Sequence, residues 1–186
     1  MKETSSARDR ILATALRLFY RDGIRATGVD RIIAESGVAK MSFYRHFPSK
    51  ADLVRAFLAA RHDYWMGWFT AAVEHRFEER GLAAIADALS DWCAEEDFRG
   101  CAFINTVAET GGEFPAAIDH KRELEAYVRS LAERLALPSP AVVAAKAMIL
   151  IEGMTFRAQM GAIAGGPGGL AEIAAQMFTE LTHSTR

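Results

Sequence analysis

The sequence has only two cysteines, Cys93 and Cys101, and no uninterrupted apolar run of membrane-spanning length. Two cysteines are too few for a disulfide framework, and no His/Cys pair has zinc-finger spacing. Charged residues interrupt every apolar stretch well before about 18 residues, which argues against a transmembrane helix. The first ten residues, MKETSSARDR, lack the apolar core of a signal peptide. We therefore expect a cytoplasmic protein without a metal or a cofactor.

Motifs that would indicate an enzyme are also missing. The sequence has no Walker phosphate loop, no recognisable Ser/His/Asp set and no cluster of metal ligands. The histidines at positions 62, 75, 120 and 183 have no evident acid or base partner in the sequence. Catalysis by residues that only the fold brings together stays open as an alternative, but we expect a protein that is not an enzyme.

What is present is an ordinary globular composition with an uneven distribution of charge. Of the 186 residues, 51% are hydrophobic and 25% are charged, which is typical of a folded, soluble chain. Residues 1–56 contain 11 Lys/Arg and 6 Asp/Glu, a net charge of +5, so the overall charge of −2 leaves −7 for residues 57–186. A basic N-terminal part favours a nucleic-acid partner. On charge alone, chance segregation of surface charge is an equal alternative.

Helix is the expected structure nearly throughout, because Ala, Leu, Glu and Arg are abundant and no stretch alternates strictly between apolar and polar residues. The first helix should end near Asp22, before Gly23. Thr27 and Ser49 each stand three residues before an aspartate, the spacing of a capping box at a helix start. Further helices are expected at about 28–36, near 40–47, from 50 to about 80, and at 82–96, 101–111, 115–136, 140–162 and 168–183.

Residues 37–50, GVAKMSFYRHFPSK, place a short helix after a glycine turn. Phe43 and Phe47, four residues apart, share one face that should hold this helix against its neighbours. The remaining side chains form an outward cationic and hydrogen-bonding face: Lys40, Met41, Ser42, Tyr44, Arg45 and His46. Two short helices joined by a turn with glycine are a helix-turn-helix pattern, and its second helix fits the DNA major groove.

Residues 10–58 resemble the DNA-binding domain of the TetR family of bacterial transcriptional regulators. The matching segments read RILATALRLF, GIRATGVDRI and GVAKMSFYRHFPSKADLV, and they cover about the first third of the chain. The resemblance implies an all-α fold with an N-terminal three-helix helix-turn-helix domain and a C-terminal helical bundle for ligand binding and dimerisation. We place the boundary so that residues 1–49 form the first domain and residues 50–186 the second.

Eight residues are assigned to the DNA-binding site: Thr27, Lys40, Met41, Ser42, Tyr44, Arg45, His46 and Lys50. The resemblance implies phosphate contacts for Thr27, Tyr44, His46 and Lys50, and base contacts for residues 40–42. Thr27 and Lys50 also stand at expected helix N-termini, whose free amides suit a phosphate. Met41 departs from the family, which often has a small residue at this position. It either contacts thymine methyl groups or crowds the groove, so the preferred operator sequence is left open.

The C-terminal part offers candidate surfaces for a second subunit and for a small molecule. Residues 140–162 are apolar almost all round and residues 168–183 carry an apolar stripe, which suits a four-helix interface in a homodimer. The alternative is that both helices only close their own core. The resemblance implies the dimer, a palindromic operator and an effector pocket. Candidate pocket residues are Trp65, Phe69, Trp92, Phe103, Asn105, Met154 and Arg157, with Glu109 as a further polar candidate.

The sequence therefore predicts a homodimeric DNA-binding repressor, released from a palindromic operator by a small-molecule effector that is apolar or aromatic. Core packing is the alternative role for each aromatic residue among the pocket candidates. A second hypothesis is a small-molecule binding protein whose DNA-binding head is vestigial. A third is a redox-responsive regulator that uses Cys93 and Cys101, with buried, inert thiols as the alternative.

Overall fold

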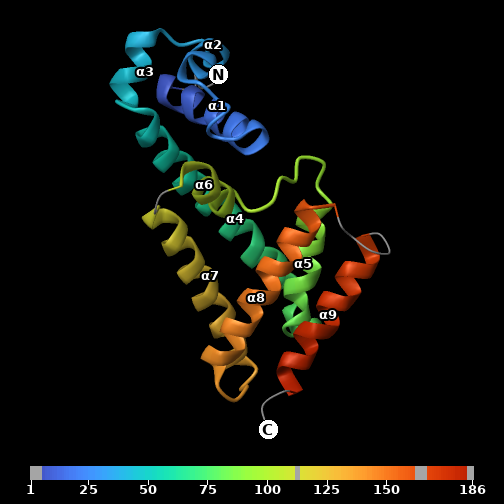
Figure 1. The fold of residues 1–186 in the computed structure, drawn as a ribbon. Coiled ribbons are helices and arrows are strands. Elements are labelled where there is room, and N and C mark those ends of the chain that lie inside the picture. The colour runs from blue at the N-terminus through green and yellow to red at the C-terminus, as the bar shows by residue number, and fades with distance from the viewer. Residues whose placement is uncertain (1–5, 112–113, 162–166, 184–186) are drawn as a thin grey trace, which may run out of the picture. The chain divides into compact units, whose positions relative to one another are not determined.

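The protein was analysed as a computed structural model, which describes residues 6–111, 114–161 and 167–183. Within these ranges the chain forms nine helices and no strand (Figure 1), which confirms the all-α expectation. The helices are α1 (Ala7–Asp22), α2 (Val29–Ser36), α3 (Lys40–His46), α4 (Lys50–Arg80), α5 (Ala83–Cys93), α6 (Ala102–Thr110), α7 (Pro115–Arg134), α8 (Pro140–Gln159) and α9 (Pro167–His183). No helix of the described ranges is both long enough and apolar enough to cross a lipid bilayer.

Contacts divide the chain into two compact units. The head unit consists of Met1–Asp63 together with Cys101–Ile118, and the body unit consists of Tyr64–Gly100 together with Asp119–Arg186. Helix α4 therefore begins in the head unit and ends in the body unit, and α6 belongs to the head unit. The sequence boundary that we placed between residues 49 and 50 coincides with the start of α4, and as a domain boundary it stays a prediction.

The head unit is built around a core to which α1, α2, α3, the first half of α4 and the segment around α6 all contribute. Its fully or nearly fully buried side chains include Ile11, Leu18, Phe19, Ile32, Phe43, Phe47, Leu53, Phe57 and Phe103. The Phe19 and Phe57 rings meet edge to face at 5.5 Å, which joins α1 to α4. This shared core holds the short helices α2 and α3, which are too short to be stable alone.

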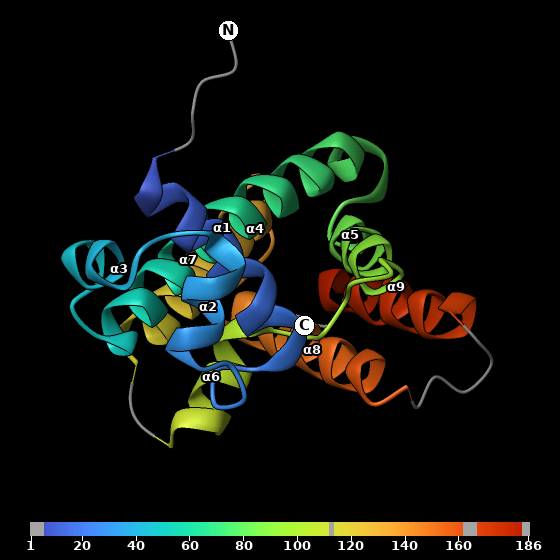
Figure 2. The same cartoon turned by 90° about the horizontal axis from the view of Figure 1, so that it is seen from above.

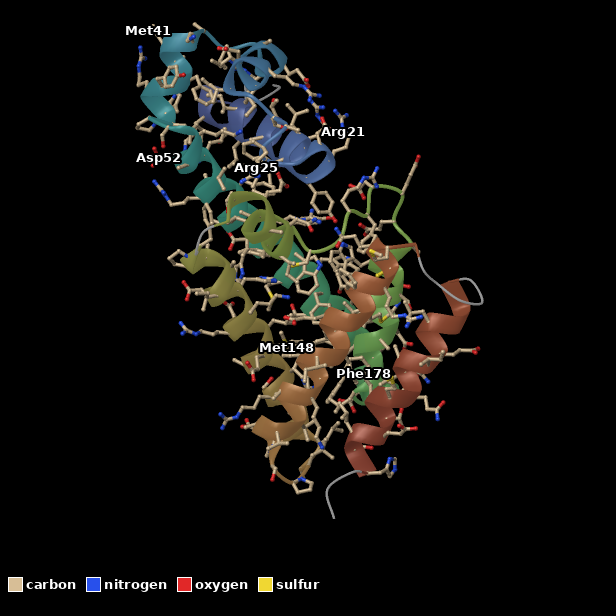
Figure 3. The ribbon with its side chains drawn as sticks, in the orientation of Figure 1. Arg21, Arg25, Met41, Asp52, Met148 and Phe178 are labelled. Carbon is tan, nitrogen blue, oxygen red and sulfur yellow. The ribbon has the colours of Figure 1, made fainter. Side chains whose placement is uncertain are left out.

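The body unit packs the second half of α4 with α5, α7, α8 and α9. Its core contains Trp65, Phe69, Leu89, Trp92, Leu124, Val128, Leu131, Ala147 and Phe178. Helix α9 lies against α5 and α8 (Figure 2). Phe178 of α9 is completely buried, and it lies between the two C-terminal helices in Figure 3. One face of the apolar helix α8 is therefore used inside the subunit.

The two predicted capping boxes have different outcomes. At the start of α4 the Ser49 amide donates to Asp52 Oδ2 at 3.0 Å and the Asp52 amide donates to Ser49 Oγ at 3.2 Å, which confirms the second box. The first box is wrong, because α2 begins at Val29 with Gly28 as its cap residue and no capping side chain. Thr27 is one position too early and completely buried, and its hydroxyl donates to the Gly23 carbonyl at 2.7 Å.

Candidate DNA-binding face and effector-binding region

Helix α3 has one buried and one exposed face, as the sequence predicts. Phe43 and Phe47 are 0% and 3% exposed, and their rings contact each other at 6.3 Å. Met41 is 79% exposed and projects from the outer side of α3 (Figure 3), and Tyr44 is 42% exposed with its ring edge against Phe43. The two phenylalanines therefore fix the orientation of α3, and that orientation turns Met41 and Tyr44 outward.

The exposed face of α3 is cationic. Lys40, Arg45 and His46 are all exposed, and Ser42 is half-buried beside them. Lys40 forms an ion pair with Asp30 at 3.4 Å, and both side chains are largely solvated. An exposed pair of this kind is worth roughly 0–1 kcal/mol, so a phosphate or a base edge can displace it at small cost. Six of the eight predicted DNA-binding residues thus lie together on α3.

Of the other two predicted DNA-binding residues, Thr27 lies in the turn between α1 and α2, and Lys50 is the first residue of α4 and contacts that turn. Lys50 is half-buried, and its Nζ donates to the Ile24 carbonyl oxygen at 2.5 Å. Burial lowers the pKa of Lys50, and the nearby charge of Glu109 partly offsets this effect. The Thr27 hydroxyl donates inside the turn, as described above. In this structure the Thr27 hydroxyl and the Lys50 ammonium each donate a hydrogen bond to a backbone carbonyl. The phosphate contacts of both residues stay a prediction.

The seven candidate pocket residues belong to two compact units and, within the body unit, to the core and to a groove. Trp65, Phe69 and Trp92 meet in the body core, where Trp65 stacks on Phe69 at 4.7 Å and meets the Trp92 ring at 5.3 Å. Phe103 and Asn105 belong to the head unit, because α6 packs there. Met154 and Arg157 line a groove between α8 and α9. Met154 is also a buried member of the same body core as the first three residues.

The body core contains two buried donors without an acceptor. Among the described residues, only the indole nitrogens of Trp65 and Trp92 are buried side-chain polar atoms that lack a hydrogen-bond partner. The His120 ring, also buried, lies 5.5 Å from Trp65, and the Phe98 ring lies 5.0 Å from Trp92. We call Trp65, Phe69, Trp92, Phe98 and His120 the indole cluster. Unpartnered buried polar atoms are uncommon in folded proteins and mark sites that need a physical explanation.

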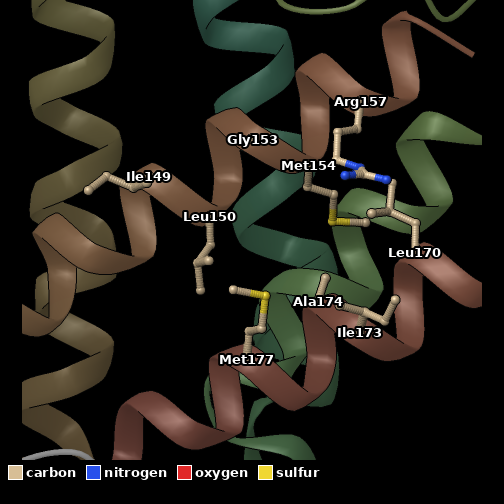
Figure 4. Close-up of a pocket in the computed structure, with 9 residues that line it drawn as sticks. All are labelled: Ile149, Leu150, Gly153, Met154, Arg157, Leu170, Ile173, Ala174 and Met177. Carbon is tan, nitrogen blue, oxygen red and sulfur yellow. The ribbon is translucent and has the colours of Figure 1, made fainter. Parts of the chain in front are cut away.

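The groove between α8 and α9 encloses about 310 Å³ and is almost entirely apolar (Figure 4). Its walls are Ile149, Leu150, Gly153, Met154, Arg157, Leu170, Ile173, Ala174 and Met177. Large apolar side chains on these two helices are strongly exposed, with values of 71% for Ile149, 61% for Phe156 and 56% for Ile173. Side chains of this kind, gathered on neighbouring helices, are typical of an interaction surface.

The two cysteines are free thiols in different compact units. Cys93 is half-buried in the body unit, and burial raises the pKa of its thiol to about 12. Cys101 is buried in the head unit. Because the thiolate is the reactive form, a raised pKa makes Cys93 less reactive. The redox hypothesis therefore gains no support from the structure.

Comparison with known proteins agrees with the fold of the head. A family model described as "Bacterial regulatory proteins, tetR family" matches residues 11–57, from α1 into the first turns of α4. The HTH-type transcriptional regulator YerO of Bacillus subtilis is 38% identical over 60 residues, which are 32% of this chain and 19% of YerO. The regulator TtgR of Pseudomonas putida is 36% identical over 62 residues, 33% of this chain and 30% of TtgR. The matched part thus spans less than a third of either relative.

Solved structures extend the likeness to nearly the whole chain. SCO4454, a TetR-family transcriptional regulator from Streptomyces coelicolor, superposes with a TM-score of 0.83 at 28% identity, over 96% of this chain and 89% of its own. A TetR-type regulator from Streptomyces avermitilis gives a TM-score of 0.81 at 26% identity, over 96% and 99% of the two chains. The helix-turn-helix head, the match to the family model and the likeness over both units lead to one conclusion: the chain belongs to the TetR family of bacterial transcriptional regulators.

Proposed function

We propose that the protein is a homodimeric repressor that binds a palindromic DNA operator and leaves it when a small-molecule effector binds. The observation that carries this proposal is the geometry of α3. The buried Phe43, on α3, and Phe47, immediately after it, fix the helix on the head unit, and the exposed residues of α3 form a cationic face of a size that fits the major groove. The protein acts in the cytoplasm, where its DNA target lies.

On DNA, the residues of α3 divide between bases and phosphates. Lys40 donates to guanine, Ser42 bonds to a base edge, and Met41 contacts a thymine methyl group. Tyr44, Arg45 and His46 contact phosphates and set the register of the helix in the groove. Lys50 has three ammonium donors, one of which is on the Ile24 carbonyl, and the other two are available to a phosphate.

The exposed apolar face of α8 and α9 is the proposed dimer interface. Each subunit contributes both helices to a four-helix bundle, which covers Ile149, Phe156 and Ile173. A twofold axis through this bundle relates the two heads. Two related heads read two half-sites whose centres lie about 34 Å, or one turn of DNA, apart or a multiple of that distance, so the operator is a palindrome.

The indole cluster is the proposed effector site. Its aromatic faces suit a planar apolar molecule, and the Trp65 and Trp92 N–H groups both need an acceptor. An aromatic effector with a carbonyl or carboxylate oxygen supplies that acceptor. An effector that binds one conformation of the body more tightly shifts the protein toward that conformation, and DNA affinity falls by the corresponding coupling factor.

The DNA-binding proposal is tested by selection from a random duplex library, and the selected sequences are then measured by gel shift at near-physiological salt. We expect enrichment of a palindrome. We expect Tyr44→Ala to bind this palindrome about tenfold more weakly or worse, because the variant loses a phosphate contact that sets the register of α3 in the groove. The matched control is Tyr64→Ala, which removes an exposed tyrosine of α4 in the body unit and should bind like the wild type.

The proposal fails if no DNA sequence outcompetes random DNA. Near-stoichiometric binding of a small aromatic acid, together with weak and non-specific DNA binding, would instead select the alternative of a binding protein with a vestigial head.

A further inference from the structure

The turn between α1 and α2 is held by a residue that lies far away in the sequence. Glu109, on α6, accepts a hydrogen bond from the Arg25 backbone amide through Oε2 at 2.8 Å, across 84 positions of the chain. Both residues belong to the head unit. A carboxylate that accepts from an amide forms a charge-assisted bond, which is about twice as strong as a neutral one.

Gly23 leaves room for this carboxylate. A Cβ atom at position 23 would lie 3.0 Å from Glu109 Oε2 and 3.1 Å from Oε1, closer than atoms of this kind normally approach. Gly23 also has a φ of 91°, which disfavours other residues. Glycine therefore suits position 23 for two reasons: its backbone conformation is one that other residues disfavour, and a side chain would crowd the Glu109 carboxylate.

Two further bonds act on the same turn. The Lys50 ammonium donates to the Ile24 carbonyl and the Thr27 hydroxyl donates to the Gly23 carbonyl. The charge of Glu109 also acts on Lys50 and favours its protonated form. Two helices thus hold the turn by hydrogen bonds. Glu109 of α6 accepts from the Arg25 amide, and Lys50 of α4 donates to the Ile24 carbonyl.

The position of this turn matters because α2 begins immediately after it. Gly28 is the cap residue of α2, and the first free amides of α2 follow at Val29. In the proposed complex these amides face the DNA backbone while the start of α3 contacts the bases, so α2 and α3 have to fit the same stretch of DNA. A change in the turn therefore changes the fit of the head to DNA without changing any residue that touches DNA.

We propose that Glu109 is a positioning residue for DNA binding: its carboxylate holds the Arg25 amide and thereby sets the α1–α2 turn in the geometry that DNA requires. The inference rests on the proposed function as a DNA-binding regulator. Segment 101–118 is also continuous at both of its ends with segments of the body unit. A conformational change in the body segments on either side of residues 101–118 would thus act on the Glu109–Arg25 contact through the backbone.

Two substitutions and one control test this role. Glu109→Ala removes the acceptor, whereas Glu109→Gln keeps an acceptor oxygen and removes only the charge. Glu125→Ala removes an exposed carboxylate from α7, in the body unit, and controls for the change in net charge. Each full-length variant is assayed for affinity to the palindrome selected with the wild type, for melting temperature, and for exchange of the Arg25 amide hydrogen by NMR.

We expect Glu109→Ala to speed Arg25 exchange and to weaken binding to the palindrome, each by about tenfold or more. Glu109→Gln should restore slow exchange and bring affinity to within about threefold of the wild type, because the amide keeps its acceptor. Glu125→Ala should match the wild type in both measurements. A purely structural contact would lower the melting temperature and leave the affinity of the folded protein unchanged.

Two results overturn the inference. One is unchanged Arg25 exchange in Glu109→Ala, which would show that the contact does not hold the turn in solution. The other is faster exchange with wild-type affinity for the palindrome, which would show that the turn does not position the head. If the wild type itself selects no sequence, the proposed function fails instead, and Arg25 exchange still reports separately whether Glu109 holds the turn.

Discussion

At the scale of single residues, two glycines differ in whether the structure needs the absence of a side chain. Gly23 has a φ of 91° and faces the Glu109 carboxylate, so the turn depends on the missing side chain. Gly67 lies within α4, and nothing would meet a Cβ atom added there. The sequence predicts a helix end at Gly23. It does not predict that Glu109 contacts the following turn, because a contact across 84 positions leaves no periodic pattern.

We expect Gly23→Ala to lower the free energy of unfolding by about 1–3 kcal/mol, because alanine is strained at this φ and crowds the carboxylate. Gly67→Ala is the matched control and should raise it by about 0.5–1 kcal/mol, because glycine is unfavourable inside a helix. Urea unfolding of both variants measures the difference. Equal stability of Gly23→Ala and the wild type would contradict the strained turn.

At the scale of elements, the sequence predicts the helices well and their ends less well. Phe43 and Phe47 are both buried, as their spacing predicts, although α3 ends at His46 and Phe47 is its extended C-cap residue. Ser49 correctly marks the start of α4. Thr27 fails as a cap because the same spacing occurs with the hydroxyl turned into the core. A third box, in which the Asp9 amide donates to Ser6 Oγ at the start of α1, has the same pattern and was missed.

The cap at Ser49 should carry a measurable part of the stability of α4. We expect Ser49→Ala to lower the free energy of unfolding by about 1 kcal/mol, because the Asp52 amide loses its acceptor. Ser90→Ala, within α5, is the control and should have little effect or a slightly stabilising one, because alanine is the better helix former. Chemical denaturation followed by circular dichroism gives both values, and equal losses at the two positions would contradict a specific cap.

At the scale of the whole molecule, the fold class follows from the sequence, whereas the grouping of its parts does not. The composition and the N-terminal motif predict an all-α chain with a helix-turn-helix head. The inclusion of α6 in the head unit depends on packing between segments that are distant in the sequence, so the sequence does not show that Phe103 and Asn105 belong to this unit, and their role in a pocket stays a prediction. Trp65, Phe69 and Trp92 are named together as pocket candidates and meet in the body core, and their role as an effector site stays a prediction.

The exposed apolar face of α8 and α9 makes a prediction about assembly. Ile149→Asp places a charge where the proposed dimer buries an apolar side chain, and it should convert a dimer into a folded monomer. Ile118→Asp changes another exposed isoleucine, on α7, and should leave the dimer intact. Sedimentation equilibrium gives the mass of each variant, and circular dichroism checks the helix content. A wild type that sediments as a monomer, or a dimer that survives Ile149→Asp, would contradict this interface.

The central claim is that the exposed face of α3 reads a DNA sequence. Its most direct test is equilibrium competition between the selected palindrome and a scrambled duplex of the same length and base composition, at near-physiological salt. The account predicts a preference for the palindrome of about 1,000-fold or more, as specific DNA-binding proteins show. Equal affinity for the two duplexes would contradict it, because charge alone would then explain all binding to DNA.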